Sequence, residues 1–199
     1  MGLATRGSLR PWVMAPGSLS RRLAALGRGF EVQLLRQGLA RLQAAERAAL
    51  GARGPSLVRE VLLHVGGEPV VWARSAVLLR ATRGPWKALK GLGTRPLAHL
   101  LYGDPRIQRS ALCPQRLPRV GATRRGLARS WQQAGQGLPP AGLQWSRSSV
   151  FTRGGAALRV MEVFAPALVG QPPGARRISG KPLPPFWVQT LPGPPRGPA

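Results

Sequence analysis

Two strand-like runs separated by a short turn constrain the fold of this chain more than any other feature. Residues 56–79 read SLVREVLLHVGGEPVVWARSAVLL, with Gly66-Gly67-Glu68-Pro69 between the runs. β-Branched residues favour strands, and glycine accepts the backbone angles of a tight hairpin turn. We therefore predict a β-hairpin over 56–79. A second hairpin is predicted around Gly154-Gly155, ending in the apolar run 157–168.

The segments around the hairpins favour short helices. Helices are predicted at 19–26, 39–50 and 94–103, and a strand at 30–37. Ser18 can cap the first helix and Gly27 can end it, while Thr94 is the expected cap of the last. Hairpin strands with a few intervening helices indicate an α+β fold built on an antiparallel sheet.

Two stretches depart from this regular pattern. Between Asp104 and Gly142 the periodicity fades into Arg, Pro, Gly and Gln, and residues 113–142 are expected to form an inserted, partly ordered loop. After Leu168 the chain is dense in proline, which predicts a disordered or loosely docked tail. The expected organisation is therefore one domain over 1–168 and a tail over 169–199.

The charge pattern points only weakly to a nucleic acid and would also favour a small anionic ligand. The chain has 30 Lys+Arg against 6 Asp+Glu, a formal net charge of +24, and such a field attracts anions. The basic residues are scattered in pairs such as Arg21–Arg22 and form no long block. This distribution indicates that arginine is used throughout the surface, and it does not form the concentrated basic patch that is typical of a nucleic-acid-binding site.

Composition also limits the possible chemistry and location. His64, His99 and the single aspartate Asp104 leave little material for a metal site, and none is expected. The single Cys113 excludes an intramolecular disulfide and is typical of a reducing compartment. With no stretch of membrane-spanning length, a soluble cytoplasmic protein is expected.

Two charged residues are predicted to lie on apolar strand faces. Alternation places Arg59 on one face with Leu57, Val61 and Leu63, and places Glu162 on one face with Leu158, Val160 and Phe164. The two could form a structural ion pair, or they could line a pocket over the sheet. In a pocket, water or a ligand would be the partner of Glu162. Arg147, which shares a face with Trp145 and Phe151, is expected to be structural.

Four segments together suggest a family. LVREVLLHVGGEPVVWARSAV, LGTRPLAHLLY, WSRSSVF and VMEVFAPAL, in this order, resemble the chorismate–pyruvate lyase family over about residues 12–112 and 143–168. The resemblance implies an antiparallel sheet whose peripheral helices act as flaps over an enclosed ligand pocket. It also implies a cofactor-free lyase that converts chorismate to 4-hydroxybenzoate and pyruvate, the first step of ubiquinone biosynthesis.

The resemblance assigns a role to each of four residues. Arg59 matches the arginine that binds the aromatic carboxylate, and Glu162 matches the glutamate at the ring-hydroxyl end. Leu97 and Leu19 match residues whose main chains contact the ligand, although Leu19 stands where other members have methionine. Both leucines fall in the first turn of a predicted helix, where free N–H groups favour anions.

Two other classes of function stay open. Ligand-binding domains of some transcription regulators share this kind of fold, so a non-catalytic small-molecule sensor is the first alternative. An arginine-rich nucleic-acid-binding protein is the second. No convincing helix-turn-helix precedes the first hairpin, which argues against a sensor with its own DNA-binding element. A monomer with no membrane span is expected.

Overall fold

One antiparallel sheet organises the molecule. The computed structural model describes residues 8–51, 53–136 and 145–173. The sheet has seven strands in the order β1-β2-β3-β7-β6-β4, and β5 pairs with β6 beside β4. The strands are β1 (Phe30–Ala40), β2 (Ser56–Val65), β3 (Glu68–Leu78), β4 (Gln108–Arg109), β5 (Cys113–Arg116), β6 (Trp145–Arg153) and β7 (Ala156–Phe164).

Both predicted hairpins are confirmed. β2 and β3 pair in register from Val65–Glu68 outward with an irregularity beside His64, and β6 and β7 pair from Arg153–Ala156. Gly66, Gly67, Gly154 and Gly155 all have positive φ, as these turns require. The α+β class and the antiparallel sheet are as predicted, and β3 joins the two hairpins by pairing with β7.

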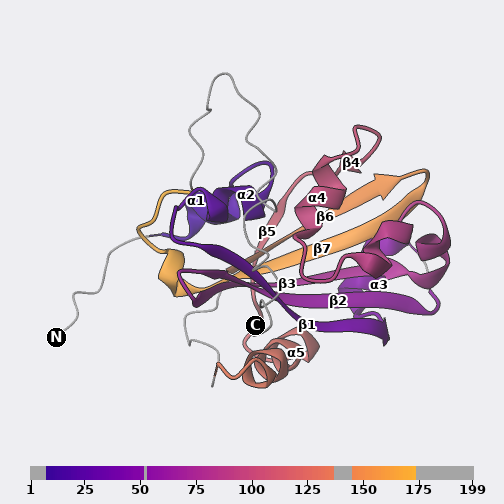
Figure 1. Ribbon diagram of the computed structural model, residues 1–199. Coiled ribbons are helices and arrows are strands. Elements are labelled where there is room, and N and C mark those ends of the chain that lie inside the picture. The colour runs from indigo at the N-terminus through magenta and orange to yellow at the C-terminus, as the bar shows by residue number, and fades with distance from the viewer. Residues whose placement is uncertain (1–7, 52, 137–144, 174–199) are drawn as a thin grey trace, which may run out of the picture.

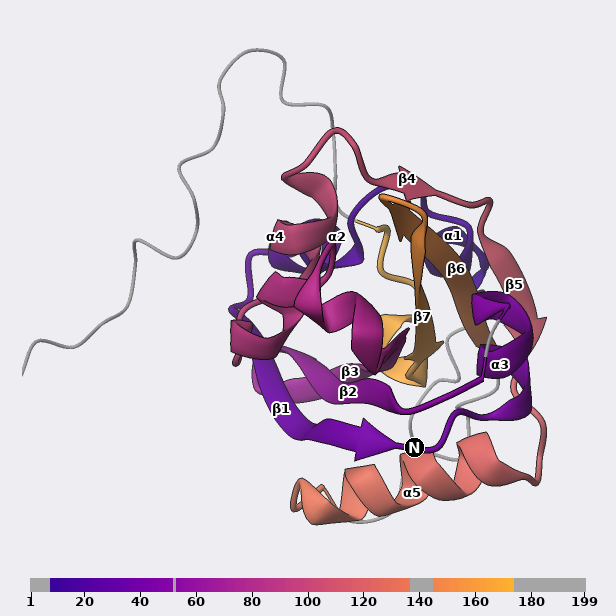
Figure 2. The same ribbon diagram turned by 90° about the vertical axis from the view of Figure 1, so that its right-hand side faces the viewer.

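Helices cover both faces of the sheet (Figures 1 and 2). α1 (Arg10–Val13), α2 (Leu19–Ala24) and α4 (Leu97–Tyr102) lie on one side, and α5 (Ala122–Gln133) lies on the other. The remaining helices are α3 (Ala44–Leu50) and the 3₁₀ turns η1 (Leu79–Arg83), η2 (Lys87–Gly91) and η3 (Pro166–Leu168). No helix in the described part of the chain is long and apolar enough to cross a membrane.

Two helix starts differ from the sequence prediction. The helix predicted at 39–50 begins at Ala44, because β1 continues to Ala40 and a capping box between Gln43 and Glu46 then starts the helix. α4 begins at Leu97 after Pro96, with no side-chain cap, so the prediction of Thr94 as its cap was wrong. Ser18 does cap α2, accepting a hydrogen bond from the Arg21 N–H at 3.2 Å.

The segment expected to be an inserted loop contains two regular elements. β5 extends the sheet beside β6, and α5 packs Leu127 and Trp131 against Trp72 and Met161 on the face away from α2 and α4. The pattern of α5 was obscured because arginines and glutamines surround its few apolar residues. Residues 137–144 lie outside the described part of the chain.

The face under α5 also holds a buried ionic network. The Arg74 guanidinium bonds Glu46 of α3 at 2.6 Å and bonds the Glu60 carboxylate, which also accepts a hydrogen bond from Ser130 of α5 at 2.7 Å. All four side chains are buried. Their charges attract one another strongly in this low-dielectric setting, so the network fixes both helices to the sheet.

Packing of the domain continues past residue 168. Val169 packs against the core cluster that contains Trp12, and the indole N–H of Trp12 donates to the Gln171 carbonyl at 2.7 Å. Residues 169 and 171 therefore take part in the packing of the core. Residues 174–199, most of the predicted tail, lie outside the described part of the chain.

Candidate functional site

A cavity lies between the sheet and the two helices α2 and α4. It is open to solvent on part of its boundary, and its empty volume of about 590 Å³ includes some of that open solvent. Its floor is formed by β3 and by the faces of β2 and β7 that alternation predicted to be apolar, including Val61, Leu63 and Val160. The predicted site residues Arg59, Glu162, Leu19 and Leu97 all line this cavity. The structure therefore brings together four positions that are far apart in the sequence.

Arg59 is a buried cation with no acidic partner among the described residues. Its side chain comes from the middle of β2, and the residue is 3% exposed. Nη2 donates to the carbonyls of Gly93 and Arg95, at 2.9 and 3.2 Å, which holds the guanidinium under the start of α4. Within the described chain Nε has no hydrogen-bond partner. Burial lowers the pKa of the Arg59 guanidinium to about 10, so it is still a cation at neutral pH.

Ser75 lies beside Arg59 and was not identified from the sequence. The two residues are register partners on β3 and β2, so their side chains are neighbours on the cavity face. Ser75 is buried, and its hydroxyl has no hydrogen-bond partner among the described residues. A buried hydroxyl without a partner is unfavourable unless a ligand or water meets it. Serine occurs at many buried positions, so the sequence carried no specific signal for this one.

Glu162 lines the cavity and is also paired. Its carboxylate accepts a hydrogen bond from Nε of Arg147 at 2.5 Å, and the side chains of Glu162 and Arg147 are 15% and 1% exposed. Arg147 also donates to the carbonyls of Trp12 and Ala15, at 3.1 and 2.7 Å. Water or ligand had been expected as the partner of Glu162, and that expectation is corrected here. The alternative of a direct pair between Glu162 and Arg59 is also wrong.

The sequence did contain a signal for the Arg147–Glu162 pair. A two-residue turn at Gly154-Gly155 makes Arg153 and Ala156 register partners. Counting outward from this turn along both strands leads directly to Arg147 opposite Glu162. Arg147 thus has the structural role that was predicted for it, and it also orients a cavity residue.

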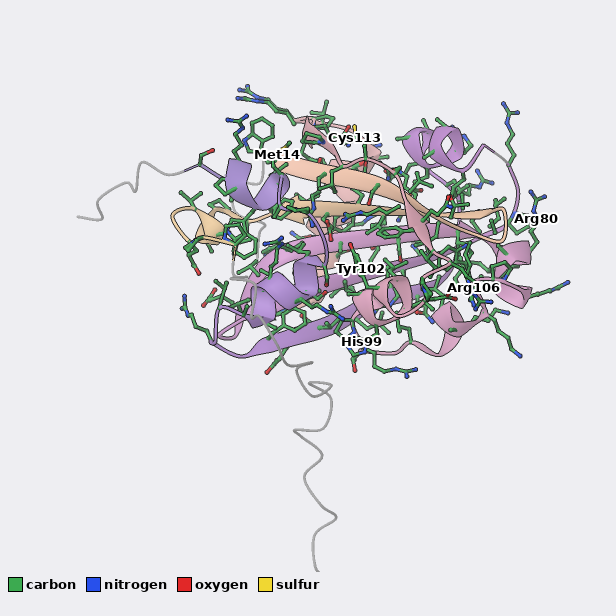
Figure 3. The ribbon with its side chains drawn as sticks, turned by 90° about the horizontal axis from the view of Figure 1, so that it is seen from above. Met14, Arg80, His99, Tyr102, Arg106 and Cys113 are labelled. Carbon is green, nitrogen blue, oxygen red and sulfur yellow. The ribbon has the colours of Figure 1, made fainter. Side chains whose placement is uncertain are left out.

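Leu19 and Leu97 occupy equivalent places over the cavity. Each is the first residue of its helix, α2 and α4 respectively. N–H groups in a first turn have no intrahelical acceptor, so the main chains at both positions present donors near the cavity. Figure 3 looks onto this side of the molecule, with Tyr102 at the end of α4 lying over the strands.

Arg109 and Tyr102 close one side of the cavity and were also missed. Nη1 of Arg109 donates to the Tyr102 hydroxyl at 2.9 Å and to the Gly17 carbonyl at 3.0 Å, and the Tyr102 hydroxyl donates to Gly17 at 2.8 Å. Burial raises the pKa of the Tyr102 phenol. Arg109 belongs to the two-residue strand β4, inside a stretch without periodicity, so no pattern pointed to it.

These features define a site for a small organic anion held over an antiparallel sheet. A buried arginine, an unsatisfied hydroxyl and two helix starts line the cavity, and all of them favour a carboxylate. Glu162 lies on β7, two strands from Arg59. The usual strand spacing then gives a backbone separation of about 10–12 Å between the two residues. Apolar side chains line the cavity between the two ends, as an aromatic or cyclohexadienyl ring requires.

Comparison with known proteins identifies the family. The family profile described as chorismate lyase matches residues 4–171. A probable chorismate pyruvate-lyase from Albidiferax ferrireducens is 46% identical over 162 residues, covering 80% of this chain and 82% of the relative. A protein of the same name from Azoarcus sp. is 44% identical over 167 residues, covering 82% and 87%. The chain belongs to the chorismate lyase family.

Solved structures support the fold at much lower identity. PhnF from Mycobacterium smegmatis has a TM-score of 0.53 at 14% identity, covering 77% of this chain and 66% of PhnF. A PhnF C-terminal domain has a TM-score of 0.51 at 14% identity, covering 72% of this chain and 87% of that domain. This likeness concerns the fold alone.

Proposed function

We propose that Arg59 and Glu162 act from opposite ends of the cavity in the reaction of the chorismate lyase family. As a member of that family, this protein is a lyase that converts chorismate to 4-hydroxybenzoate and pyruvate. The ether bond between the ring and the enolpyruvyl group breaks, and the hydrogen on the hydroxyl-bearing ring carbon leaves as a proton. That proton ends on the methylene carbon of the enolpyruvyl fragment, which becomes the methyl group of pyruvate.

The observation that carries this assignment is the unpaired buried charge of Arg59. A buried cation without an acidic partner is unfavourable in the empty protein. A ring carboxylate would supply that partner, and Nε of Arg59 and the Ser75 hydroxyl are both free to bind it. The main-chain N–H groups of Leu19 and Leu97 would complete the receptor. Holding the ring in this way fixes its other end toward Glu162.

Two roles are open to Glu162 at the hydroxyl end. It can accept the ring proton as a general base, or it can orient the ring hydroxyl while the proton moves within the substrate. Arg147 holds the carboxylate in one position in both cases. The aromatic product is far more stable than the cyclohexadiene, so the protein's contribution is to position the substrate and exclude water.

The test combines a reaction assay with a substitution at the carboxylate end. Purified protein should form 4-hydroxybenzoate from chorismate, followed by ultraviolet absorbance. Arg59→Lys should weaken 4-hydroxybenzoate binding by about 10- to 100-fold in calorimetry, because lysine cannot reproduce the guanidinium's planar donor geometry. Arg41→Lys, at an exposed position, should bind like the parent protein. Unchanged product affinity in Arg59→Lys would remove Arg59 from the site.

We further propose that the protein works in the cytoplasm as a monomer, within ubiquinone biosynthesis. The single cysteine, Cys113, is exposed and is typical of a reducing compartment. Light scattering of the purified protein would test the monomer, and the molar mass of a dimer would contradict it.

A further inference from the structure

The cavity has more positive charge than one carboxylate ligand requires. Arg59, Arg74 and Arg109 are all part of its lining, but the Arg74 side chain lies on the opposite face of the sheet. Arg74 is bonded to Glu46 and Glu60. Arg59 and Arg109 have no acidic partner among the described residues. The site therefore presents two uncompensated cations to its ligand.

Arg109 makes hydrogen bonds with neutral oxygen atoms. Nε donates to the Ser149 hydroxyl at 3.0 Å, and Nη1 donates to the Gly17 carbonyl and the Tyr102 hydroxyl. The guanidinium carbon lies 5.2 Å from the centre of the Phe151 ring. These contacts fix the plane of the guanidinium. Within the described chain they leave Nη2 without a protein acceptor, so this nitrogen is available to a ligand.

Arg59 and Arg109 lie on opposite sides of the sheet floor. Arg59 pairs with Ser75, Ser75 pairs with Val160 and Val160 pairs with Ser149, to which Arg109 is bonded. This row spans three strand spacings, about 14 Å at the level of the backbone. Long arginine side chains can bring both guanidinium groups closer together above this floor.

In the strand order, β7 with Glu162 lies between β2 with Arg59 and β4 with Arg109. Glu162 is next to the row just described, and the neighbouring strand β6 carries its partner Arg147. A ring held by its carboxylate at Arg59 thus has Glu162 at its far end. Of the two ring carbons beside that end, the one nearer β6 would direct its substituent toward Arg109.

We propose that Arg109 binds the enolpyruvyl carboxylate of chorismate. This proposal rests on the proposed function, and it assigns to Arg109 the binding of the substrate's second carboxylate. Chorismate has two carboxylates, one on the ring and one on the enolpyruvyl group, whose ether oxygen is attached next to the hydroxyl-bearing carbon. After the ether bond breaks, pyruvate keeps the carboxylate at Arg109 and 4-hydroxybenzoate keeps the one at Arg59. Arg109 thus distinguishes substrate from product, while Arg59 binds both.

The experiment compares substrate and product in Arg109→Gln. Loss of one charge-assisted contact should lower kcat/KM for chorismate by about 10- to 100-fold. The affinity for 4-hydroxybenzoate, measured by calorimetry, should change less than about threefold, because the product has no second carboxylate. Arg109→Lys, which keeps the positive charge, should recover part of the lost kcat/KM. Arg106→Gln, in the same α4–β4 connection but outside the cavity lining, should leave both quantities unchanged.

Three results would overturn the proposal. An equal loss of chorismate and product affinity in Arg109→Gln would show that Arg109 only holds the cavity closed. Tyr102→Phe breaks the same contact with Gly17 but keeps the cation, so the same phenotype in that variant would also show a structural role. An unchanged kcat/KM in Arg109→Gln would remove Arg109 from substrate binding. If the parent protein does not convert chorismate at all, the proposed function itself fails.

Discussion

Two buried arginines of one hairpin show how environment decides what the same side chain does. Arg59 and Arg74 lie on neighbouring strands and face opposite sides of the sheet. Arg74 has two carboxylate partners, whereas Arg59 has two carbonyl acceptors and a nitrogen without a partner. Arg74 is therefore part of the structural framework. Arg59 carries a charge without an acidic partner in the described chain, which costs stability.

The first prediction contrasts these two residues. Arg74→Met should destabilise the protein by about 3–5 kcal/mol, because Glu46 and Glu60 lose their buried cation. Arg59→Met should cost much less unfolding free energy, since it removes an uncompensated charge. Urea unfolding of the empty proteins measures both. Arg59→Met should also lose the stabilisation that 4-hydroxybenzoate gives the parent protein. Equal destabilisation by the two substitutions would contradict this contrast.

The second prediction concerns Glu162→Gln. Turnover per folded molecule should fall by about 100-fold or more if Glu162 is the general base, and by less if it only orients the hydroxyl. Product should still bind through the Arg59 end. Arg147 keeps its bonds to Trp12 and Ala15, so the expected loss of stability is smaller than for Arg74→Met. Steady-state kinetics and urea unfolding should be measured on the same preparation. A strongly destabilised variant with full turnover per folded molecule would refute the catalytic role.

At the level of elements, strand periodicity carried most of the predictable structure. The two-residue repeat located both hairpins and correctly placed Arg59 and Glu162 on cavity faces. Helix limits were less predictable, because β1 runs into the segment before α3 and a capping box decides where that helix starts. α5 was missed because its burial depends on a partner face of the sheet that local sequence does not reveal.

The site was predictable only as far as periodicity and resemblance reached. Ser75 stands out because its hydroxyl has no hydrogen-bond partner in the described chain, and Arg109 because its partners are all neutral oxygen atoms. Neither property can be seen before β3, β4 and β6 are assembled. The Arg147–Glu162 pair could have been predicted from the register of the β6–β7 hairpin. Arg59 and Glu162 line the same cavity only because β3 pairs with β7. This pairing connects segments about 90 residues apart and leaves no local signal in the sequence.

The third prediction concerns the end of the domain. A chain ending at Pro173 should unfold at the same urea concentration as the full chain. Ending at Leu168 removes Gln171, whose carbonyl accepts the buried Trp12 indole N–H. The unpaired donor should cost about 1–3 kcal/mol, and the loss of Val169 packing adds to this. Equal midpoints for the two truncated chains would show that residues 169–173 contribute nothing.

For the molecule as a whole, the fourth prediction concerns its large positive charge. The formal net charge is +24, so some binding to nucleic acid is expected at low salt. That binding should weaken steeply as salt rises, because it rests on counterion release. Fluorescence anisotropy with a labelled oligonucleotide at several salt concentrations measures the slope. A sequence-specific complex with submicromolar affinity at physiological salt would support the nucleic-acid alternative instead.

The pairing of β3 with β7 has a consequence for how the protein gains activity as it folds. Each hairpin can form from local contacts, but joining them requires closing a long loop, which slows folding. Arg59 belongs to one hairpin and Glu162 to the other. Neither hairpin alone contains both ends of the cavity. During refolding, lyase activity should therefore return only with the last, long-range step, after most of the secondary structure has already formed.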